Sequence, residues 1–237
     1  MQSGFVHSFE SGAAADGPGV RFALFLTGCS FRCVYCHNPD TWELSRGKKM
    51  TSDEVLGEIG KYARFLRIAG GLTVTGGDPL CQADFTHEIL ERSQKELGLH
   101  TALDTQGFLA DKLPDSWFDA VDLVLLDIKQ IHPEKHLALT GKNAEPTLRF
   151  AERLECMGKK FWLRYVLVPG ITDDETDLKN LAAFIKPFTC MERVEVLPFH
   201  QLGKHKWEEM NLPYSLANTR VPTREEVCLA ESILRGG

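Results

Sequence analysis

The sequence predicts an α/β fold in which six parallel strands and the helices between them form a partial, open (β/α)6 barrel. Two observations carry this prediction: short apolar runs alternate with amphipathic stretches of helical period, and polar clusters recur where the apolar runs end. Strands that alternate with helices pair in parallel through right-handed crossovers. A closed eight-stranded barrel takes about 250 residues. The 237 residues of this chain therefore favour an open, TIM-like barrel with its active site at the carboxyl ends of the strands.

Six apolar runs have the length and composition of buried strands. They are rich in Val, Leu, Phe and Ile and are bounded by polar residues or glycine, as strands of a parallel sheet are. The runs are Val20–Leu26, Leu72–Thr75, His100–Asp104, Leu123–Ile128, Phe161–Val168 and Arg193–Leu197.

Five stretches between these runs are predicted to be helices, and three of them have an explicit start signal. Thr51-Ser52-Asp53-Glu54 has the pattern of a capping box, and the helix it begins is expected to end at Gly70-Gly71. The same pattern recurs at residues 172–175 and 223–226. The stretches 82–97 and 146–158 carry the helical period with weaker boundaries.

Composition excludes several classes of protein. With 43% hydrophobic residues the chain can bury a core, which excludes a disordered tail, and its net charge of −6 argues against binding the phosphate backbone of nucleic acid. No apolar run approaches the roughly 20 residues of a membrane span, and Met1–Phe5 lacks the features of a secretory signal. We expect a cytoplasmic protein without nucleic-acid or membrane partners. It should form one domain, residues 1–237, with an N-terminal extension, residues 1–19.

Polar clusters follow the ends of the predicted strands. The carboxyl ends of parallel strands meet at one edge of a sheet, where α/β proteins have their active sites. Arg164 lies within its strand instead, where alternation points its side chain toward the barrel interior. We therefore expect these residues to meet at one mouth of the barrel. The clusters are Thr27-Gly28-Cys29, Gly76-Gly77-Asp78-Pro79, Asp104-Thr105, Asp127-Ile128-Lys129 and His200.

Cys29, Cys33 and Cys36 place three thiols on one loop, residues 29–36. Soft thiolates select zinc, copper(I) or iron–sulfur clusters, and a structural zinc would need a fourth ligand, for which His37 is the local candidate. Because adjacent residues rarely both face one ion, a three-cysteine site with an open metal position is the more natural interpretation. It favours a [4Fe–4S] cluster over zinc. The other cysteines are scattered and are expected to be small buried residues: Cys81, Cys156, Cys190 and Cys228.

The segment Cys29–Cys36, with the aromatic Tyr35 before its third cysteine, resembles the signature of the radical S-adenosylmethionine (SAM) superfamily. Segments along nearly the whole chain resemble the glycyl-radical-enzyme activase branch of that superfamily, and within it the pyruvate formate-lyase activating enzymes. These segments are Asp16–Arg21, Cys36–Trp42, Thr75–Pro79, Asp104-Thr105, Leu126–Lys129, Arg164–Gly170 and Leu197–Trp207.

The resemblance implies a mechanism and its partners. Three cysteines would hold a [4Fe–4S] cluster whose open iron binds SAM, and the reduced cluster would cleave SAM to a 5′-deoxyadenosyl radical. That radical would remove a hydrogen from a backbone glycine of a partner enzyme. The implied partners are pyruvate formate-lyase (formate acetyltransferase) and a reduced flavodoxin-like electron donor, and the implied activase is a monomer.

The resemblance also implies residue roles around the cofactor. Gly76, Gly77 and Asp78 would contact SAM, with Asp78 accepting from the SAM ammonium group, and Lys129 would pair with the SAM carboxylate. The adenosine part would meet His200. Further contacts are implied for residues beside these, namely Tyr35, Cys36, His37 and Ile128.

Two further sets of residues receive roles by resemblance. Asp104, Thr105 and Asp127 would hold a monovalent cation, Na⁺ or K⁺, whose preference is for oxygen ligands. Asp16 and Arg164 would lie near the incoming glycine loop of the partner. A simpler interpretation of Arg164 is an ion pair with a strand-end carboxylate such as Asp127.

Three alternatives stay open at this level. The target could be another glycyl-radical enzyme, the substrate could be a small molecule, or the cysteines could bind zinc in a module without catalytic activity. Taken alone, Lys129 is interpreted as a solvated charge. The segment Lys204–Lys206 is either a solvated loop or a contact for the partner.

Overall fold

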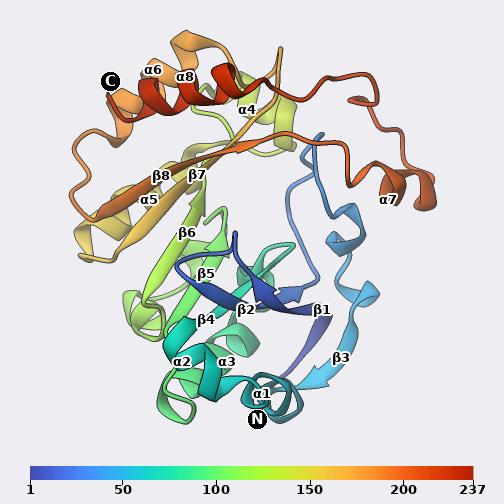
Figure 1. Cartoon of the computed structure of the whole chain (residues 1–237), viewed down its shortest axis with the longest axis vertical. Coiled ribbons are helices and arrows are strands. Elements are labelled where there is room, and N and C mark those ends of the chain that lie inside the picture. Colours follow the sequence, from blue (N-terminus) through green and yellow to red (C-terminus); the bar gives the residue numbers. More distant parts are fainter. Residues whose placement is uncertain (237) are drawn as a thin grey trace. The chain divides into compact units, whose positions relative to one another are not determined.

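The computed structural model describes residues 1–236 (Figure 1). Its strands lie in one eight-stranded sheet with the order β3-β1-β2-β4-β5-β6-β7-β8. The pairs β2–β4, β4–β5 and β7–β8 are parallel, whereas β1 pairs antiparallel with β2 and β3. The predicted α/β class is confirmed, since the sheet is mostly parallel and does not close.

The boundaries of the elements are as follows. The strands are β1 (Ser3–Ala13), β2 (Val20–Leu26), β3 (Lys48–Thr51), β4 (Gly70–Gly76), β5 (Thr101–Thr105), β6 (Leu123–Asp127), β7 (Phe161–Leu167) and β8 (Met191–Pro198). The α-helices are α1 (Ser52–Gly60), α2 (Ala63–Ala69), α3 (Ala83–Lys95), α4 (Pro133–Thr140), α5 (Glu145–Cys156), α6 (Glu175–Ile185), α7 (Lys204–Glu209) and α8 (Arg224–Leu234). Short 3-10 helices span Pro39–Thr41, Leu44–Arg46, Pro79–Gln82, Ala110–Lys112 and Asp115–Ala120.

The described chain divides into two compact units. The first unit comprises Met1–Ser30 and Thr41–Leu125, and the second comprises Phe31–Asp40 and the described residues from Leu126 onward. The cysteine loop is thus shared: Cys29 belongs to the first unit, and Cys33 and Cys36 belong to the second.

The first unit contains the two strands that the sequence did not predict. All six apolar runs are strands, β2 with the expected boundaries and the others within about two residues. β1, by contrast, lies inside the segment expected to be an extension. Its buried residues Gly4 and Val6 alternate with the half-buried Phe5 and His7, and residues 10–12 are exposed, as expected for an antiparallel strand with one solvated face.

Two of the three predicted capping boxes form. The Thr51 and Thr223 hydroxyls accept from the backbone N–H three residues later, and the Glu side chains at those positions accept in return. The helix expected to run to Gly70 is interrupted at Lys61-Tyr62 and forms α1 and α2. The box at Thr172 does not form, because its hydroxyl donates to Val166 O. Asp174 caps α6 instead.

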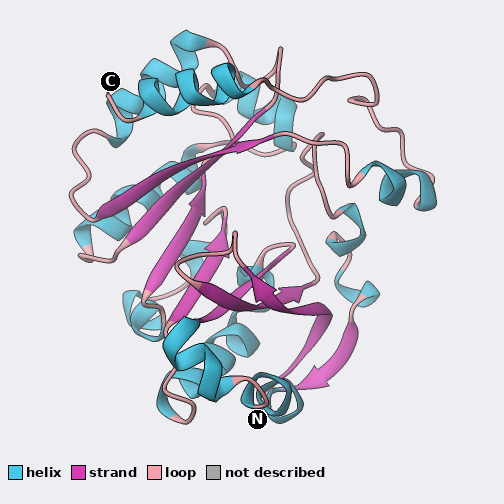
Figure 2. Cartoon of the chain, viewed as in Figure 1, coloured by secondary structure: helices cyan, strands magenta, loops and turns pink. Residues whose placement is uncertain are grey.

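In the second unit, β7 and β8 pair in parallel, and α8 lies next to both α6 and β8 (Figure 2). The second part of the cysteine loop is attached to the end of α4, a helix that the sequence did not predict. Arg32 N donates to Thr140 O at 2.8 Å, and Val34 N donates to Leu139 O at 3.0 Å. None of the helices in residues 1–236 is long and apolar enough to cross a membrane.

Candidate functional site

In the first unit, tight backbone packing fixes the residues that follow β2 and β4. Gly28 N donates to Thr41 O at 2.7 Å, and Asp78 N donates to Gly28 O at 2.8 Å. A Cβ atom on Gly77 would lie 2.3 Å from Gly28 O, and one on Gly76 would lie 2.2 Å from Leu26 O. The close approach that these glycines permit is therefore between two segments of this chain. A contact of Gly76 and Gly77 with a ligand stays a prediction.

Asp78 and Thr105 come together from the ends of neighbouring strands. Asp78 is fully buried, and its Oδ1 accepts from Leu80 N at 3.2 Å and from Thr105 Oγ1 at 2.7 Å. The Thr105 hydroxyl in turn accepts from Gly107 N at 3.0 Å. Both predicted ligand-binding side chains therefore take part in a buried network, which holds the end of β5 against the turn after β4.

Asp104 and Gln106 flank Thr105 and make separate contacts. Asp104 is half-buried, and its Oδ2 accepts from Thr75 Oγ1 at 2.7 Å. Gln106 is buried, and its Nε2 donates to Cys29 Sγ at 3.8 Å. Gln106 was absent from the predicted site, and its position directly after the Asp104-Thr105 pair is the signal that could have found it.

Asp16 lies on the loop that precedes β2, whereas Cys29 follows the other end of that strand. The Asp16 carbonyl accepts from the hydroxyl Oγ1 of Thr73, in the middle of β4, at 2.6 Å. The structure therefore does not place the Asp16 backbone at the carboxyl ends of the strands.

A fully buried arginine, which the sequence did not predict, lies next to this loop. Arg21 Nε donates to Thr73 Oγ1 at 3.0 Å, and its Nη2 donates to the Leu72 and His100 carbonyls. Burial lowers the pKa of Arg21 to about 10, against the opposing charges of Asp122 and Asp16. Arg21, on β2, thus connects that strand to β4 and to the residue before β5.

In the second unit, Cys33 is buried near an ion pair. Lys129 Nζ lies 2.9 Å from Asp127 Oδ2 and 5.8 Å from the centroid of the Tyr35 ring. Burial raises the pKa of the Cys33 thiol to about 12, although the positive charge of Lys129 opposes this effect. Burial acts to lower the pKa of Lys129, but Asp127, Tyr35 and Cys33 together outweigh it and hold that pKa well above its usual range.

The solvated interpretation of Lys129 is wrong, because its side chain is only 14% exposed. Tyr35 is buried as well, and its hydroxyl oxygen makes no hydrogen bond within the described residues. The structure thus brings Cys33, Tyr35, Asp127 and Lys129 together, and their roles toward a cluster or SAM stay predictions.

The end of the cysteine loop is held by α7. Trp207 Nε1 donates to Cys36 O at 2.9 Å, and Lys206 Nζ donates to Asn38 Oδ1 at 2.7 Å and pairs with Asp40 at 3.1 Å. For Lys206, the solvated-loop interpretation is therefore wrong. The segment around it braces the loop that carries Cys36.

His37 and His200 are adjacent. Their rings meet edge to face with centroids 4.8 Å apart, and His200 is exposed. Burial lowers the pKa of His37, and the neighbouring His200 and Lys206 lower it further. The ring that His37 meets is therefore a second imidazole, which makes protonation of His37 less favourable.

Arg164 is 8% exposed and pairs across the sheet with Glu195, its register partner on β8. Arg164 Nε lies 3.7 Å from Glu195 Oε2. The carboxylate suggested as its simpler partner, Asp127, is paired with Lys129 instead. Ile128 N donates to Arg164 O at 3.2 Å, which places these two predicted site residues side by side.

All seven cysteines are free thiols. The expectation that the four scattered ones are buried is wrong for Cys156 and Cys228, which are exposed, and Cys81 and Cys190 are partly exposed. Free thiols in the spacing of the loop have the donor chemistry that iron–sulfur clusters require. Within residues 1–236, no three His, Cys, Asp or Glu side chains are arranged to hold a metal ion, and the ligand sets stay predictions.

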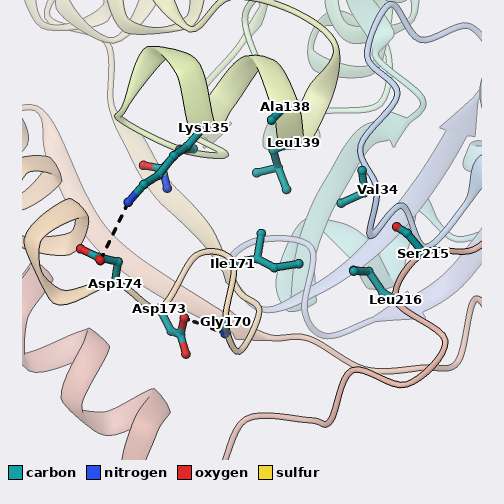
Figure 3. A pocket seen from close by; sticks show the side chains of 11 residues that line it. Val34, Lys135, Ala138, Leu139, Gly170, Ile171, Asp173, Asp174, Ser215 and Leu216 are labelled. Atoms are coloured by element: carbon teal, nitrogen blue, oxygen red, sulfur yellow. Dashed lines mark hydrogen bonds and ion pairs between the residues drawn. The ribbon is translucent and has the colours of Figure 1, made fainter.

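The second unit also contains a cavity of about 580 Å³ beside the cysteine loop (Figure 3). Val34, Leu139 and Ile171 give it an apolar wall. The Lys135 ammonium at its rim lies 2.6 Å from Asp177 and 3.9 Å from Asp174. The charge of this lysine is therefore already paired, and the sequence predicted none of the residues that line the cavity.

Comparisons with known proteins point to the same chemistry as the three-cysteine loop. Residues 24–182 match the model of the radical SAM superfamily. The chain is 43% identical over 235 residues to a pyruvate formate-lyase-activating enzyme of Staphylococcus epidermidis, with 96% of this chain and 93% of that protein covered. It is 41% identical to the pyruvate formate-lyase 1-activating enzyme of Escherichia coli, with 98% and 95% covered.

A solved structure supports the fold. A radical SAM methyltransferase from Sphaerobacter thermophilus matches with a TM-score of 0.64 at 16% identity, covering 91% of this chain and 64% of that one. At this identity the likeness concerns the fold alone.

Proposed function

The chain belongs to the radical SAM superfamily. We propose that it is a glycyl-radical-enzyme activase whose substrate is pyruvate formate-lyase. The observation that carries the proposal is the 41–43% identity to named pyruvate formate-lyase-activating enzymes over nearly the full length of both chains. A shared domain alone would support the chemistry but not the target.

The superfamily implies a [4Fe–4S] cluster and SAM. What supports the cluster on this chain is the chemistry of its donors, since Cys29, Cys33 and Cys36 are free thiols on one loop. The cluster, when bound, supplies the electron that cleaves SAM and so generates the radical that takes a hydrogen from glycine. Cys29, Cys33 and Cys36 would hold it. Burial raises the pKa of the Cys33 thiol, so binding of this residue to iron would have to be coupled to loss of its proton, as it is for other metal-bound thiols.

The remaining residues would position the cofactor and exclude water. In the second unit, Lys129 stays charged and oriented by Asp127 and would meet a carboxylate of SAM. In the first unit, the Asp78–Thr105 network fixes the turn that would approach the SAM ammonium. Tyr35 would cover the cluster, and Cys36, His37, Ile128 and His200 would line the cofactor in the second unit.

A monovalent cation at Asp104, Thr105 and Asp127 is part of the proposal. The Thr75 hydroxyl orients Asp104 in the first unit, which supports a fixed oxygen ligand there. Activity should fall when Na⁺ and K⁺ are replaced by a large organic cation. Identical SAM cleavage rates in both media would contradict a cation site.

We also propose a cytoplasmic monomer with a single domain that receives electrons from a reduced flavodoxin-like protein. Asp16 and Arg164 are assigned to docking of the glycine loop. These assignments rest on the resemblance of the chain to the activases. To reach a substrate, Arg164 would have to give up its contact with Glu195.

The test is anaerobic incubation of the reconstituted protein with SAM, a reductant and pyruvate formate-lyase, followed by electron paramagnetic resonance. A glycyl radical on the partner that fails to appear with Cys33→Ala supports the proposal. About four iron and four sulfide per chain would exclude zinc. SAM cleavage without any radical on pyruvate formate-lyase would direct the search to another glycyl-radical enzyme or a small molecule.

A further inference from the structure

Gln106 contacts the sulfur of a predicted cluster ligand within the first unit. Its side chain is 4% exposed, and its Nε2 lies 3.8 Å from Cys29 Sγ, within hydrogen-bonding distance for a sulfur acceptor. A thiolate bound to iron has lone pairs and no hydrogen, so it can only accept. The amide must therefore present its NH₂ group to the sulfur, which is the orientation observed.

Hydrogen bonds of the adjoining residues hold both ends of this contact. Cys29 N donates to Trp42 O at 3.0 Å, which fixes the backbone that carries the sulfur. On the other side, Thr105 is bonded to Asp78, and Gly107 N donates to the Thr105 hydroxyl at 3.0 Å. Gln106 thus stands between two anchored residues, and its amide reaches the sulfur from a rigid support.

We propose that Gln106 is a positioning residue that raises the reduction potential of the cluster by donating a hydrogen bond to Cys29 Sγ. This inference rests on the proposed function, because it requires Cys29 to ligate the cluster. Hydrogen bonds to cluster sulfurs stabilise the reduced state, which carries one more negative charge than the oxidised state. The contact therefore makes the electron easier to place on the cluster.

The test is a potentiometric titration of the reconstituted cluster, followed by electron paramagnetic resonance, in the parent and in two variants. Gln106→Leu keeps the volume and removes the donor. Gln106→Asn keeps the amide but withdraws it by roughly one carbon–carbon bond, about 1.5 Å, which breaks a contact that is already long. Both variants should have a more negative potential. We expect the ratio of reduced to oxidised cluster at a fixed potential to fall about tenfold, equivalent to about 59 mV for one electron.

Gln94→Leu is the matched control, because it removes another amide of the first unit, one that donates to Thr101 Oγ1 at 3.0 Å. Its potential should equal that of the parent. Thermal unfolding of the proteins without cluster checks that the Gln106 variants fold, and if Gln106→Leu does not, Gln106→Asn alone decides.

The possible results separate this inference from the proposed function. Normal iron and sulfide content with an unchanged or higher potential in the Gln106 variants would overturn the role of Gln106 and leave the activase intact. A parent protein that takes up no iron and sulfide would overturn both.

Discussion

The two units hold their predicted site residues by different physical means. In the first unit, the carboxylates Asp78 and Asp104 accept from the hydroxyls of Thr105 and Thr75, and the adjoining backbone is packed so closely that only glycine fits. In the second unit, the carboxylates Asp127 and Glu195 face the cations Lys129 and Arg164. The stability of the first unit should therefore be sensitive to substitutions that change side-chain shape. The stability of the second unit should be sensitive to substitutions that change charge.

This difference matches the two tasks of the proposed mechanism. A turn that approaches a ligand through its backbone must keep its geometry, which hydroxyl contacts and close packing provide. Groups that meet a charged cofactor must keep their ionisation, which an ion pair at low exposure provides. Four measurements test this difference between the two units.

The largest effect is expected for the cysteines of the second unit. Cys33→Ala removes a buried thiolate ligand, and the reconstituted protein should lose nearly all of its iron, from about four per chain. Cys156→Ala, an exposed cysteine of the same unit, should lose none. Iron and sulfide analysis after anaerobic reconstitution measures both, and full retention in Cys33→Ala contradicts the ligand assignment.

The next effect tests the importance of shape in the first unit. Gly77→Ala forces a methyl group to within 2.3 Å of the Gly28 carbonyl, a backbone atom that cannot rotate away, and should cost about 3 kcal/mol of unfolding free energy. At Gly57, in the middle of α1, a Cβ atom would meet no other atom within 4 Å. Gly57→Ala should therefore stabilise the protein by roughly 0.5–1 kcal/mol. Equal stabilities of the two variants in a urea titration would show that the turn is not tightly packed.

A smaller effect tests the importance of charge in the second unit. Lys129→Met leaves the carboxylate of Asp127, 18% exposed, without its ammonium partner and should cost about 1–2 kcal/mol. Lys160 pairs with Glu192 at 2.7 Å, but both side chains are largely exposed. The control Lys160→Met should therefore change stability by less than about 0.5 kcal/mol. If the two lysine variants unfold at the same urea concentration, the Asp127–Lys129 pair does not stabilise the unit.

The smallest effect is a dependence of stability on pH through His136. Burial lowers the pKa of this histidine, Lys129 lowers it further, and the Lys142 carbonyl at 2.8 Å opposes the shift. The unfolded chain therefore binds a proton more readily than the folded one. Stability should be fully present above the unfolded pKa of about 6.5 and decrease as the pH falls below it.

Thermal unfolding between pH 7.5 and pH 5 measures this contribution. His136→Gln should flatten the acid limb of the profile, whereas the control His132→Gln, on an exposed residue close in the chain, should leave it unchanged. An identical slope in all three proteins would contradict a role for His136.

The sequence predicted those elements of the fold whose formation depends on residues close together in the chain. Apolar runs identify the strands, because a parallel strand is buried on both faces, and β2 and β7 follow directly from this rule. β1 was missed because it is antiparallel and half-exposed. The break between α1 and α2 was missed although α1 ends at Gly60, because the apolar period continues across it at Tyr62 and Leu66.

For the site, residue types were predictable and pairings were not. The spacing of the cysteines and the strand-end carboxylates pointed to the chemistry. That Arg164 pairs with Glu195 instead of Asp127 follows from the register of β7 on β8, which no local pattern contains. The contact of Gln106 with Cys29 joins residues 77 positions apart and needs the assembled sheet.

The hydrogen bond from Trp207 to Cys36 joins residues 171 positions apart in the chain, and this separation has a consequence during synthesis. A ribosome adds roughly 5–20 residues per second, so Cys36 emerges about 10–30 s before its brace can form. During that interval the loop has its thiols but lacks the contact that fixes its end. We therefore expect iron to be inserted after translation is nearly complete, and nascent chains that stall before Trp207 to expose cysteines to oxidation.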